Sequence, residues 1–113
     1  MPMPTTVQRG NLLFDAIFGL TLSPASVAAN SAAEQQFPFP GLLLGVDYVI
    51  GVSKPTVQAG LSLGNVRVVA NNTIGIQFVN GSGSPIVPTA GEIYAIEVAR
   101  FESAGLPLPN AIT

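Results

Sequence analysis

Carboxylates are the side chains of this protein that could most readily carry acid–base chemistry. The sequence has six of them, at Asp15, Glu34, Asp47, Glu92, Glu97 and Glu102. Asp47 and Glu97 fall at outward positions of expected strands, so strand pairing could bring them together, and two carboxyl groups flanking a glycosidic bond can hydrolyse it. Aromatic groups that would hold a sugar are sparse, because Trp is missing and Tyr48 and Tyr94 have inward parity. We therefore expect surface ion pairs, such as Glu97 with Arg67, and no catalysis.

Other reactive groups are few. The chain has no Cys and no His, which removes thiolate and imidazole nucleophiles and the commonest transition-metal ligands. A hydroxyl nucleophile needs a base, and the one candidate pair, Ser53 beside Lys54, has no catalytic spacing. The glycine-containing segment 80–84 could be mistaken for a phosphate-binding loop, but it has no Lys and no helical pattern follows it. Without an Asp-rich loop we expect no bound Ca²⁺. We predict a non-enzymatic protein without a cofactor or a metal.

The charge content of the chain is unusual. Its 113 residues fit one domain, and its net charge of −2 with four scattered cations argues against nucleic-acid binding. Charged residues make up 9% of the sequence, against roughly 25% in ordinary soluble domains. Gly, Ser, Thr and Asn could supply a neutral polar surface. We favour the alternative, in which much of the surface is buried against further copies or a partner.

The apolar stretches of the chain are short. The longest, residues 16–22 and 42–46, fall well below the roughly 18 residues of a membrane-spanning helix, so we expect no membrane insertion. Arg9, the apolar residues 12–22 and the small residues 26–28 imitate the three regions of a signal peptide. Asp15 interrupts that apolar region. We expect no cleavage here.

Residues 65–100 carry the clearest secondary-structure pattern. Apolar residues alternate in 66–70 and again in 74–78, which is typical of strands with one buried face. Asn71-Asn72 separates the two runs, and Asn tolerates the positive φ of a tight hairpin turn. A third alternating run, Tyr94 to Val98, follows a Gly/Ser/Pro loop. These runs predict a three-stranded meander.

The segments before this region are less certain. The prolines of residues 1–10 predict an extended arm. Residues 11–22 fit a helical stripe that Gly19 weakens, so both a short helix and an extended clamp stay open. In either form, their large apolar residues would fold back on the core or grip a neighbouring molecule. Ser23–Gln36 has the capping residues and alanines of a helix. Read to Phe39, the same segment instead alternates with period two, which indicates a strand with a bulge near Asn30-Ser31. Pro38 would place this strand at a sheet edge. We favour the strand.

The remaining segments complete an all-β assignment. Residues 47–53 read as a strand, residues 54–64 as a loop of around ten residues, and the prolines after Phe101 predict an extended tail. These elements predict an antiparallel β-sandwich or small barrel of about five to seven strands with extended arms at both ends. We expect an N-terminal arm at 1–22, a β-sandwich domain at 23–101 and a C-terminal tail at 102–113.

Several segments resemble small β-rich structural proteins of tailed bacteriophages, in particular capsid decoration (cement) proteins. The resemblance runs from Ser23 to Arg100 and is carried by Pro55–Leu61, Asn65–Val68, Asn72–Ile74, Phe78–Asn80 and Pro88–Tyr94. It implies a non-enzymatic homotrimer on the outer surface of the virion head, where it binds the major capsid protein and stabilises the shell.

Under this resemblance we expect the apolar N-terminal segment and the loop at residues 54–64 to contact the capsid. The candidate partner-binding residues are Leu12, Leu13, Phe14, Ile17, Phe18, Leu20, Pro55, Val57 and Leu61. The alternative is a fibre or spike module that binds host surface glycans or attaches a fibre to the virion. That alternative predicts exposed aromatic residues, for which Phe37, Phe39 and Phe101 are the candidates.

Overall fold

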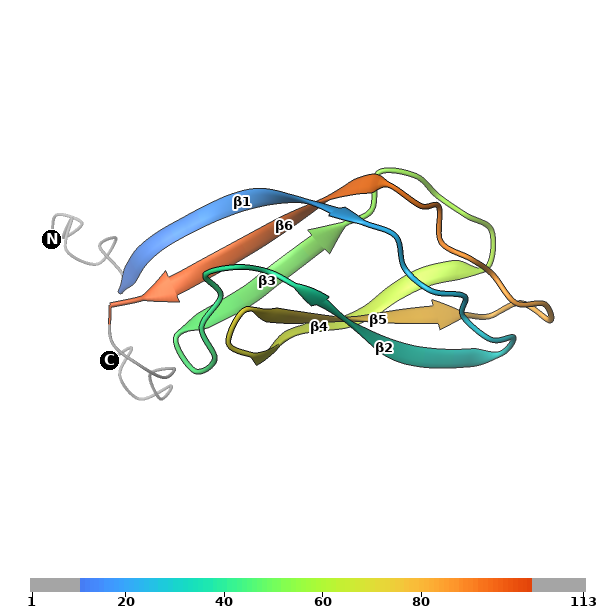
Figure 1. Ribbon diagram of the computed structural model, residues 1–113, viewed down its shortest axis with the longest axis horizontal. Coiled ribbons are helices and arrows are strands. Elements are labelled where there is room, and N and C mark those ends of the chain that lie inside the picture. Colours follow the sequence, from blue (N-terminus) through green and yellow to red (C-terminus); the bar gives the residue numbers. More distant parts are fainter. Residues whose placement is uncertain (1–10, 103–113) are drawn as a thin grey trace, which may run out of the picture.

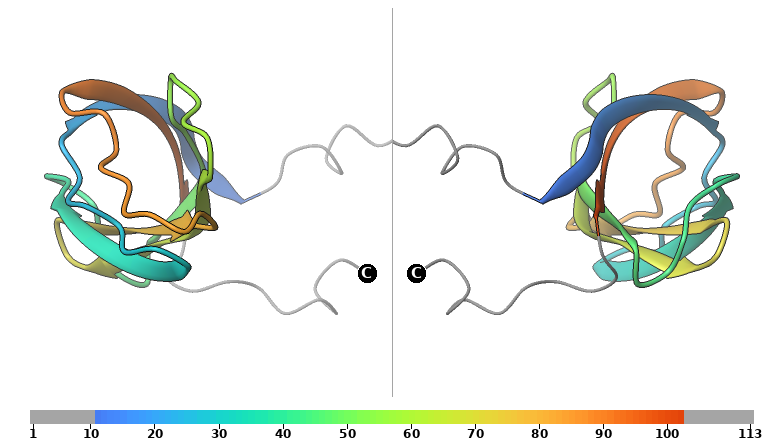
Figure 2. Two further views of the ribbon diagram at one scale, coloured as in Figure 1. Left: turned by 90° about the vertical axis from the view of Figure 1, so that its right-hand side faces the viewer. Right: turned by 90° about the vertical axis from the view of Figure 1, so that its left-hand side faces the viewer.

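The structure is a computed structural model that describes residues 11–102 and consists of two stacked β-sheets. The six strands are β1 (Leu12–Leu22), β2 (Ser31–Pro38), β3 (Asp47–Ser53), β4 (Leu61–Ala70), β5 (Thr73–Asn80) and β6 (Glu92–Phe101). One sheet has the order β1-β6-β3 and the other β2-β5-β4, and all pairs are antiparallel. Figure 1 shows the strands along their length. Seen end-on in Figure 2, the sheets form opposite walls around one interior. The fold is the predicted sandwich.

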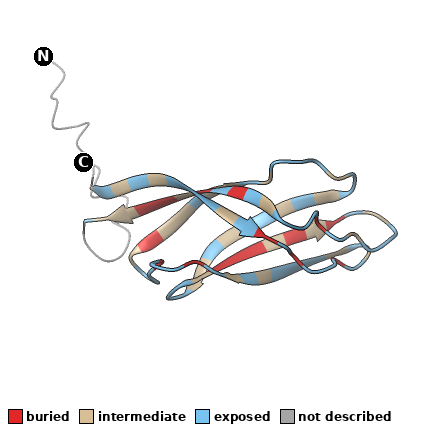
Figure 3. Cartoon of the chain, turned by 45° about the horizontal axis from the view of Figure 1, so that its top comes forward, coloured by how far each residue is buried: buried red, intermediate tan, exposed pale blue. Residues whose placement is uncertain are grey.

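The core lies between the two central strands, β5 and β6. Alternate residues of each strand are almost completely buried, as the red bands of Figure 3 show along both strands. They are Ile74, Ile76 and Phe78 on β5 and Tyr94, Ile96 and Val98 on β6. Each such side chain contributes about 1.5–3 kcal/mol through its removal from water. The period-two pattern of these residues therefore determines which face of each sheet points inward.

The turn between β4 and β5 confirms the predicted hairpin. Asn72 adopts a φ of 63°, in the left-handed region that Asn tolerates better than most residues. Its side-chain Oδ1 accepts a hydrogen bond from the Gly41 amide at 2.8 Å, and Asn71 Oδ1 accepts one from Leu44 at 3.0 Å. The two Asn side chains thus also attach the β2–β3 connection to the hairpin.

The predicted three-stranded meander is wrong in its third member. β6 does not pair with β5 but lies in the other sheet, between β1 and β3. The connection through residues 81–91 crosses from one sheet to the other, and its Ile86 pairs with Val27 in an isolated antiparallel bridge. Because β5 and β6 each carry a strongly apolar face, stacking them in two layers buries both faces at once.

The ambiguous segment 23–39 contains a strand and no helix. β2 covers Ser31–Pro38, while the preceding residues are irregular apart from the bridge at Val27. Asn30 has a φ of 50°, which interrupts the extended conformation where a bulge was expected. β2 is an edge strand, as Pro38 predicted, since Pro has no N–H to donate to a neighbouring strand.

The expected N-terminal arm at 1–22 is wrong for residues 12–22. These residues form β1, which pairs with β6 from Leu12↔Phe101 to Leu22↔Glu92. Leu22 is buried, and Phe14 and Leu20 pack against the core, so the segment is an integral strand of the sandwich. The loop is also shorter than expected at residues 54–60, because β4 begins at Leu61. The arms predicted for residues 1–10 and 103–113 lie outside the described residues.

Candidate interaction surface

The outer face of the β1-β6-β3 sheet is unusually apolar. Its large side chains alternate with those that point into the core, and several are more than half exposed: Leu13 at 64%, Ile17 at 73%, Ile50 at 57% and Ile93 at 63%. Ile50 is the extra residue of a bulge in β3, between Val49 and Gly51. Within residues 11–102 no other layer covers this face, and an uncovered apolar sheet face is typical of a contact surface.

Two carboxyl groups are embedded in this apolar face. Asp15 and Glu97 lie diagonally across the β1–β6 pair, with Glu97 directly opposite Ile17. A hydrogen bond between the two carboxyl groups, together with the like charge of Asp15, raises the pKa of Glu97 above its usual range. The approach of Glu97 to Asp47 that strand pairing could have produced does not occur, since Asp47 lies further along β3, opposite Arg100.

The outer face of the β2-β5-β4 sheet is polar by comparison. Arg67 of β4 donates two hydrogen bonds to Glu34 of β2, from Nε at 2.7 Å and from Nη2 at 2.9 Å. The pair bridges the two edge strands over Gly75 of the central strand, where a Cβ would come within 2.6 Å of the Glu34 carboxylate. This ion pair lowers the pKa of Glu34. The expected pairing of Arg67 with Glu97 is therefore wrong.

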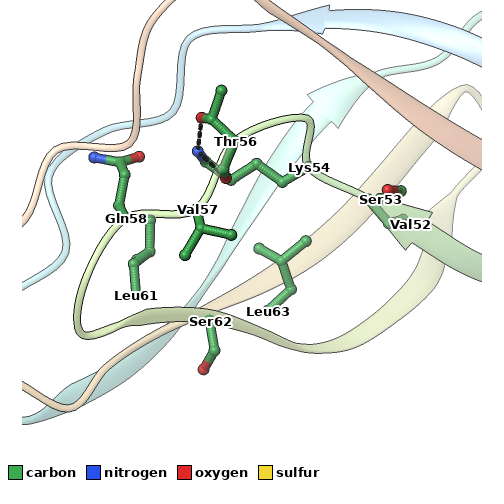
Figure 4. A pocket seen from close by; sticks show the side chains of 9 residues that line it. All are labelled: Val52, Ser53, Lys54, Thr56, Val57, Gln58, Leu61, Ser62 and Leu63. Carbon is green, nitrogen blue, oxygen red and sulfur yellow. Dashed lines mark hydrogen bonds between the residues drawn. The ribbon is translucent and has the colours of Figure 1, made fainter.

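The loop between β3 and β4 is held by a polar cluster. The Lys54 Nζ atom donates hydrogen bonds to the backbone carbonyl and the hydroxyl of Thr56 (Figure 4). It also lies 2.9 Å from Glu92 Oε1. The Thr56 hydroxyl donates to Glu92 Oε2 at 2.6 Å, and these two interactions lower the pKa of Glu92. The Lys54 and Glu92 side chains are largely buried.

A second set of hydrogen bonds fixes the other end of this loop. The Gln58 side chain donates to the Val87 carbonyl at 3.0 Å and accepts from the Thr89 amide at 2.9 Å. Between these two anchors, Val57 is 95% exposed. Its side chain stands at the mouth of a cleft that Leu61 and Leu63 line from β4 (Figure 4). The loop thus presents an apolar side chain on a well-anchored backbone.

The nine predicted partner-binding residues divide into two groups. The exposed ones are Leu12, Leu13, Ile17, Phe18, Pro55 and Val57, and the ones that are partly buried against the core are Phe14, Leu20 and Leu61. Val52 and Ser53 line both the hollow beside Ile17 and the cleft beside Val57, so the end of β3 connects the β1 residues with the loop.

Sequence reasoning missed part of this surface. Ile50 and Ile93 belong to it. Ile93 stands at an outward position in the strand alternation, which was the available signal. Ile50 has the parity of Tyr48, which the alternation placed inward, and it is exposed as the extra residue of the bulge in β3, which alternation does not predict. The aromatic residues proposed for glycan binding are less exposed than that alternative needs, because Phe39 is buried, Phe37 packs on Phe78, and Phe101 lies against Tyr48.

No clustered metal ligands occur in the part of the chain that the structure describes. Within residues 11–102 there is likewise no helix long and apolar enough to cross a membrane. Comparisons of the chain with models of protein families, with curated proteins and with solved structures return no match. The resemblance to decoration proteins therefore rests on the sequence segments quoted above.

Proposed function

We propose that this protein is a non-enzymatic virion structural protein, a capsid decoration protein that binds the major capsid protein on the outer surface of the head and stabilises it. The proposal combines the sequence resemblance with the charge depletion of the chain. It assigns the binding of the capsid and of further copies to the apolar side of the molecule.

The observation that carries the proposal is the contrast between the two outer faces. One sheet exposes Ile17, Ile50 and Ile93, one on each of its three strands, while the other is crossed by the Arg67–Glu34 ion pair. Removing three such side chains from water contributes several kcal/mol to association, at about 1.5–3 kcal/mol for each fully buried residue. Exposure of such an apolar face to water is unfavourable in free energy, and contact with a partner removes that exposure.

The anchored loop supports the same assignment. Val57 projects from a backbone that the buried Lys54–Glu92 pair and the Gln58 hydrogen bonds hold in place. Because the loop is already ordered, a partner that binds Val57 loses little conformational entropy on the side of this protein. A decoration protein needs many such small and pre-formed contacts.

The direct test is co-sedimentation of the purified chain with undecorated heads assembled from a tailed-bacteriophage major capsid protein. Deleting residues 1–22 would remove β1 from the sandwich, so the test uses point substitutions. Ile93→Ser and Val57→Ser should each weaken binding about tenfold or more, because a buried Ile or Val side chain contributes about 1.5–3 kcal/mol.

The matched control is Leu44→Ser, which removes a side chain that is 57% exposed in the β2–β3 connection, outside both candidate contact sets. It should decorate heads as well as the parent chain does. Full occupancy by the Ile93→Ser and Val57→Ser double variant would overturn the assignment of these contacts. Failure of the parent chain to bind any such head would overturn the proposed function.

A further inference from the structure

The four edge strands of the sandwich differ in how they are protected against pairing with another chain. An unprotected edge presents free backbone N–H and C=O groups to any extended segment, and proteins usually blunt such edges with Pro, charge, bulges or short length. β2 ends in Pro38 and carries Glu34, and β3 has seven residues with a bulge at Ile50. β4 is interrupted by two register shifts.

β1 lacks most of these protections. It is the longest strand, with 11 residues, and its one register shift lies at its start, between Leu12 and Phe14. It contains neither Pro nor a cation, and Asp15 is its single charged residue. Of the strands described, β6 alone pairs with β1, so within residues 11–102 no strand pairs with the opposite edge of β1.

The side chains along this edge are apolar. Ile17 is exposed on the outer face of the sheet, and Phe18, whose position alternates toward the interior, is still 39% exposed at the opening between the two sheets. Phe18 is held in place by edge-to-face contact with Phe39, at 5.6 Å between ring centroids. The edge is therefore ordered as well as apolar.

We propose that β1 pairs with β1 of a second copy of this chain, antiparallel about a two-fold axis, to give a continuous six-stranded sheet. Ile17 is the midpoint of Leu12–Leu22, so a two-fold axis at Ile17 uses the full length of the strand. Ile17 then faces Ile17 of the second copy, and an isologous interface closes after two subunits.

The charge distribution along β1 fits this register. About an axis at Ile17, residue 15 lies opposite residue 19 of the second copy, so Asp15 meets Gly19 instead of a second Asp15. Like charges placed directly opposite each other destabilise a strand pair, and this register avoids them. Leu13 meets Thr21 on the same face. A neutral, apolar strand requires no oppositely charged partner, and a second copy supplies the same neutral strand.

This inference is independent of the proposed function, because it concerns the purified chain alone. It replaces the homotrimer that the resemblance implies with a dimer. It also extends the apolar outer face, since joining two β1-β6-β3 sheets edge to edge doubles the area that carries Ile50 and Ile93.

The test is the mass of the full chain in solution, without heads, by sedimentation velocity over a range of concentrations. The parent chain should be a dimer. Ile17→Lys should raise the dimer dissociation constant by more than about tenfold, because it sets two cations against each other at the axis. Ile93→Lys is the matched control: Ile93 is similarly exposed on the same face but lies on the central strand, and its variant should remain dimeric.

A thiol at the axis provides a second readout. The chain has no Cys, so Ile17→Cys introduces a single thiol, and mild oxidation should convert the variant to a disulfide-linked dimer while Ile93→Cys remains uncrosslinked. A parent chain that is monomeric at high concentration, or trimeric, would overturn the inference. Equal dimer dissociation constants for the two Lys variants would also overturn it and would point to contact through the sheet face. Equal disulfide crosslinking of the two Cys variants would overturn it as well.

Discussion

The carboxylate of Asp47 accepts hydrogen bonds from Nε and Nη2 of Arg100, at 2.6 and 2.8 Å, across the β3–β6 pair. Asp47 Oδ2 also accepts from the Leu43 amide at 2.8 Å, and the guanidinium lies 5.0 Å from the centroid of the Phe14 ring. Arg100 Nη2 donates in addition to the Gly41 carbonyl. One ion pair therefore joins β1, β3, β6 and the β2–β3 connection.

Substitution of Asp47 should destabilise the fold strongly. The Asp47 side chain is buried, and Asp47→Asn leaves the Arg100 guanidinium without its counter-ion. We expect the free energy of unfolding to fall by about 3 kcal/mol, the lower end of the range for a broken buried pair, as measured by urea denaturation. Glu34→Gln, which breaks the exposed Arg67 pair, serves as the control and should have a much smaller effect. Equal losses for the two variants would contradict the assigned importance of the buried pair.

The same pair makes stability depend on acid pH. The hydrogen bonds from Arg100 hold the pKa of Asp47 below its ordinary value of 3.8. The stabilisation is therefore fully present above about pH 4 and is lost as the pH falls through the lower pKa of the folded state. Denaturation curves at pH 7, 4 and 2.5 should show the difference between the parent chain and Asp47→Asn shrinking toward acid. A constant difference over this range would mean that Asp47 does not titrate as the geometry requires.

Gly75 should be sensitive to the addition of a single methyl group. A Cβ there would lie 2.6 Å from both Glu34 Oε2 and Val69 Cγ2, so Gly75→Ala must displace the ion pair and shift Val69. We expect a loss of about 1–3 kcal/mol in unfolding free energy, typical of overpacking. Gly51→Ala is the matched control, because nothing lies within 4 Å of its Cβ position. That variant should be as stable as the parent chain, and a larger loss there than at Gly75 would refute this account.

Asn72 contributes to the stability of the β4–β5 turn in two ways, through its side-chain hydrogen bond and through its tolerance of a positive φ, and substitutions can separate the two. Asn72→Ala loses the side-chain hydrogen bond to Gly41 and keeps a Cβ at positive φ, which costs about 1–2 kcal/mol for an ordinary residue. Asn72→Gly loses the same hydrogen bond but has no such strain. Thermal unfolding should therefore rank the parent chain first, then Gly, then Ala. If Ala proved as stable as Gly, backbone strain would not explain the presence of Asn at this turn.

Local sequence patterns predicted the positions of the strands better than they predicted which strands pair. Alternation predicted β3, β5 and β6, and Asn71-Asn72 predicted the hairpin, because these signals act over a few residues. The position of β6 in the other sheet depends on which apolar faces stack, and alternation alone does not encode that choice. β1 was ambiguous because its apolar residues occupy both faces of the strand, Phe14 and Leu20 inward, Leu13 and Ile17 outward.

The charged contacts show the same limit. Asp47 was expected at the surface, since a lone carboxylate is rarely buried, but Arg100, 53 positions later, neutralises it. The partner of Arg67 likewise lies on a strand whose pairing the sequence left open. The exposed apolar residues were more accessible to prediction: Ile17 and Val57 were identified, and Ile93 could have been found from its outward position.

The unlike outer faces also limit how such molecules could accumulate. On an apolar support the protein would lie with the isoleucines down and with the Glu34–Arg67 bridge toward water. A second molecule arriving later would meet only the polar outer face of the first. That polar face offers little for the apolar outer face of the second molecule to bind. Coating would thus stop at a single layer.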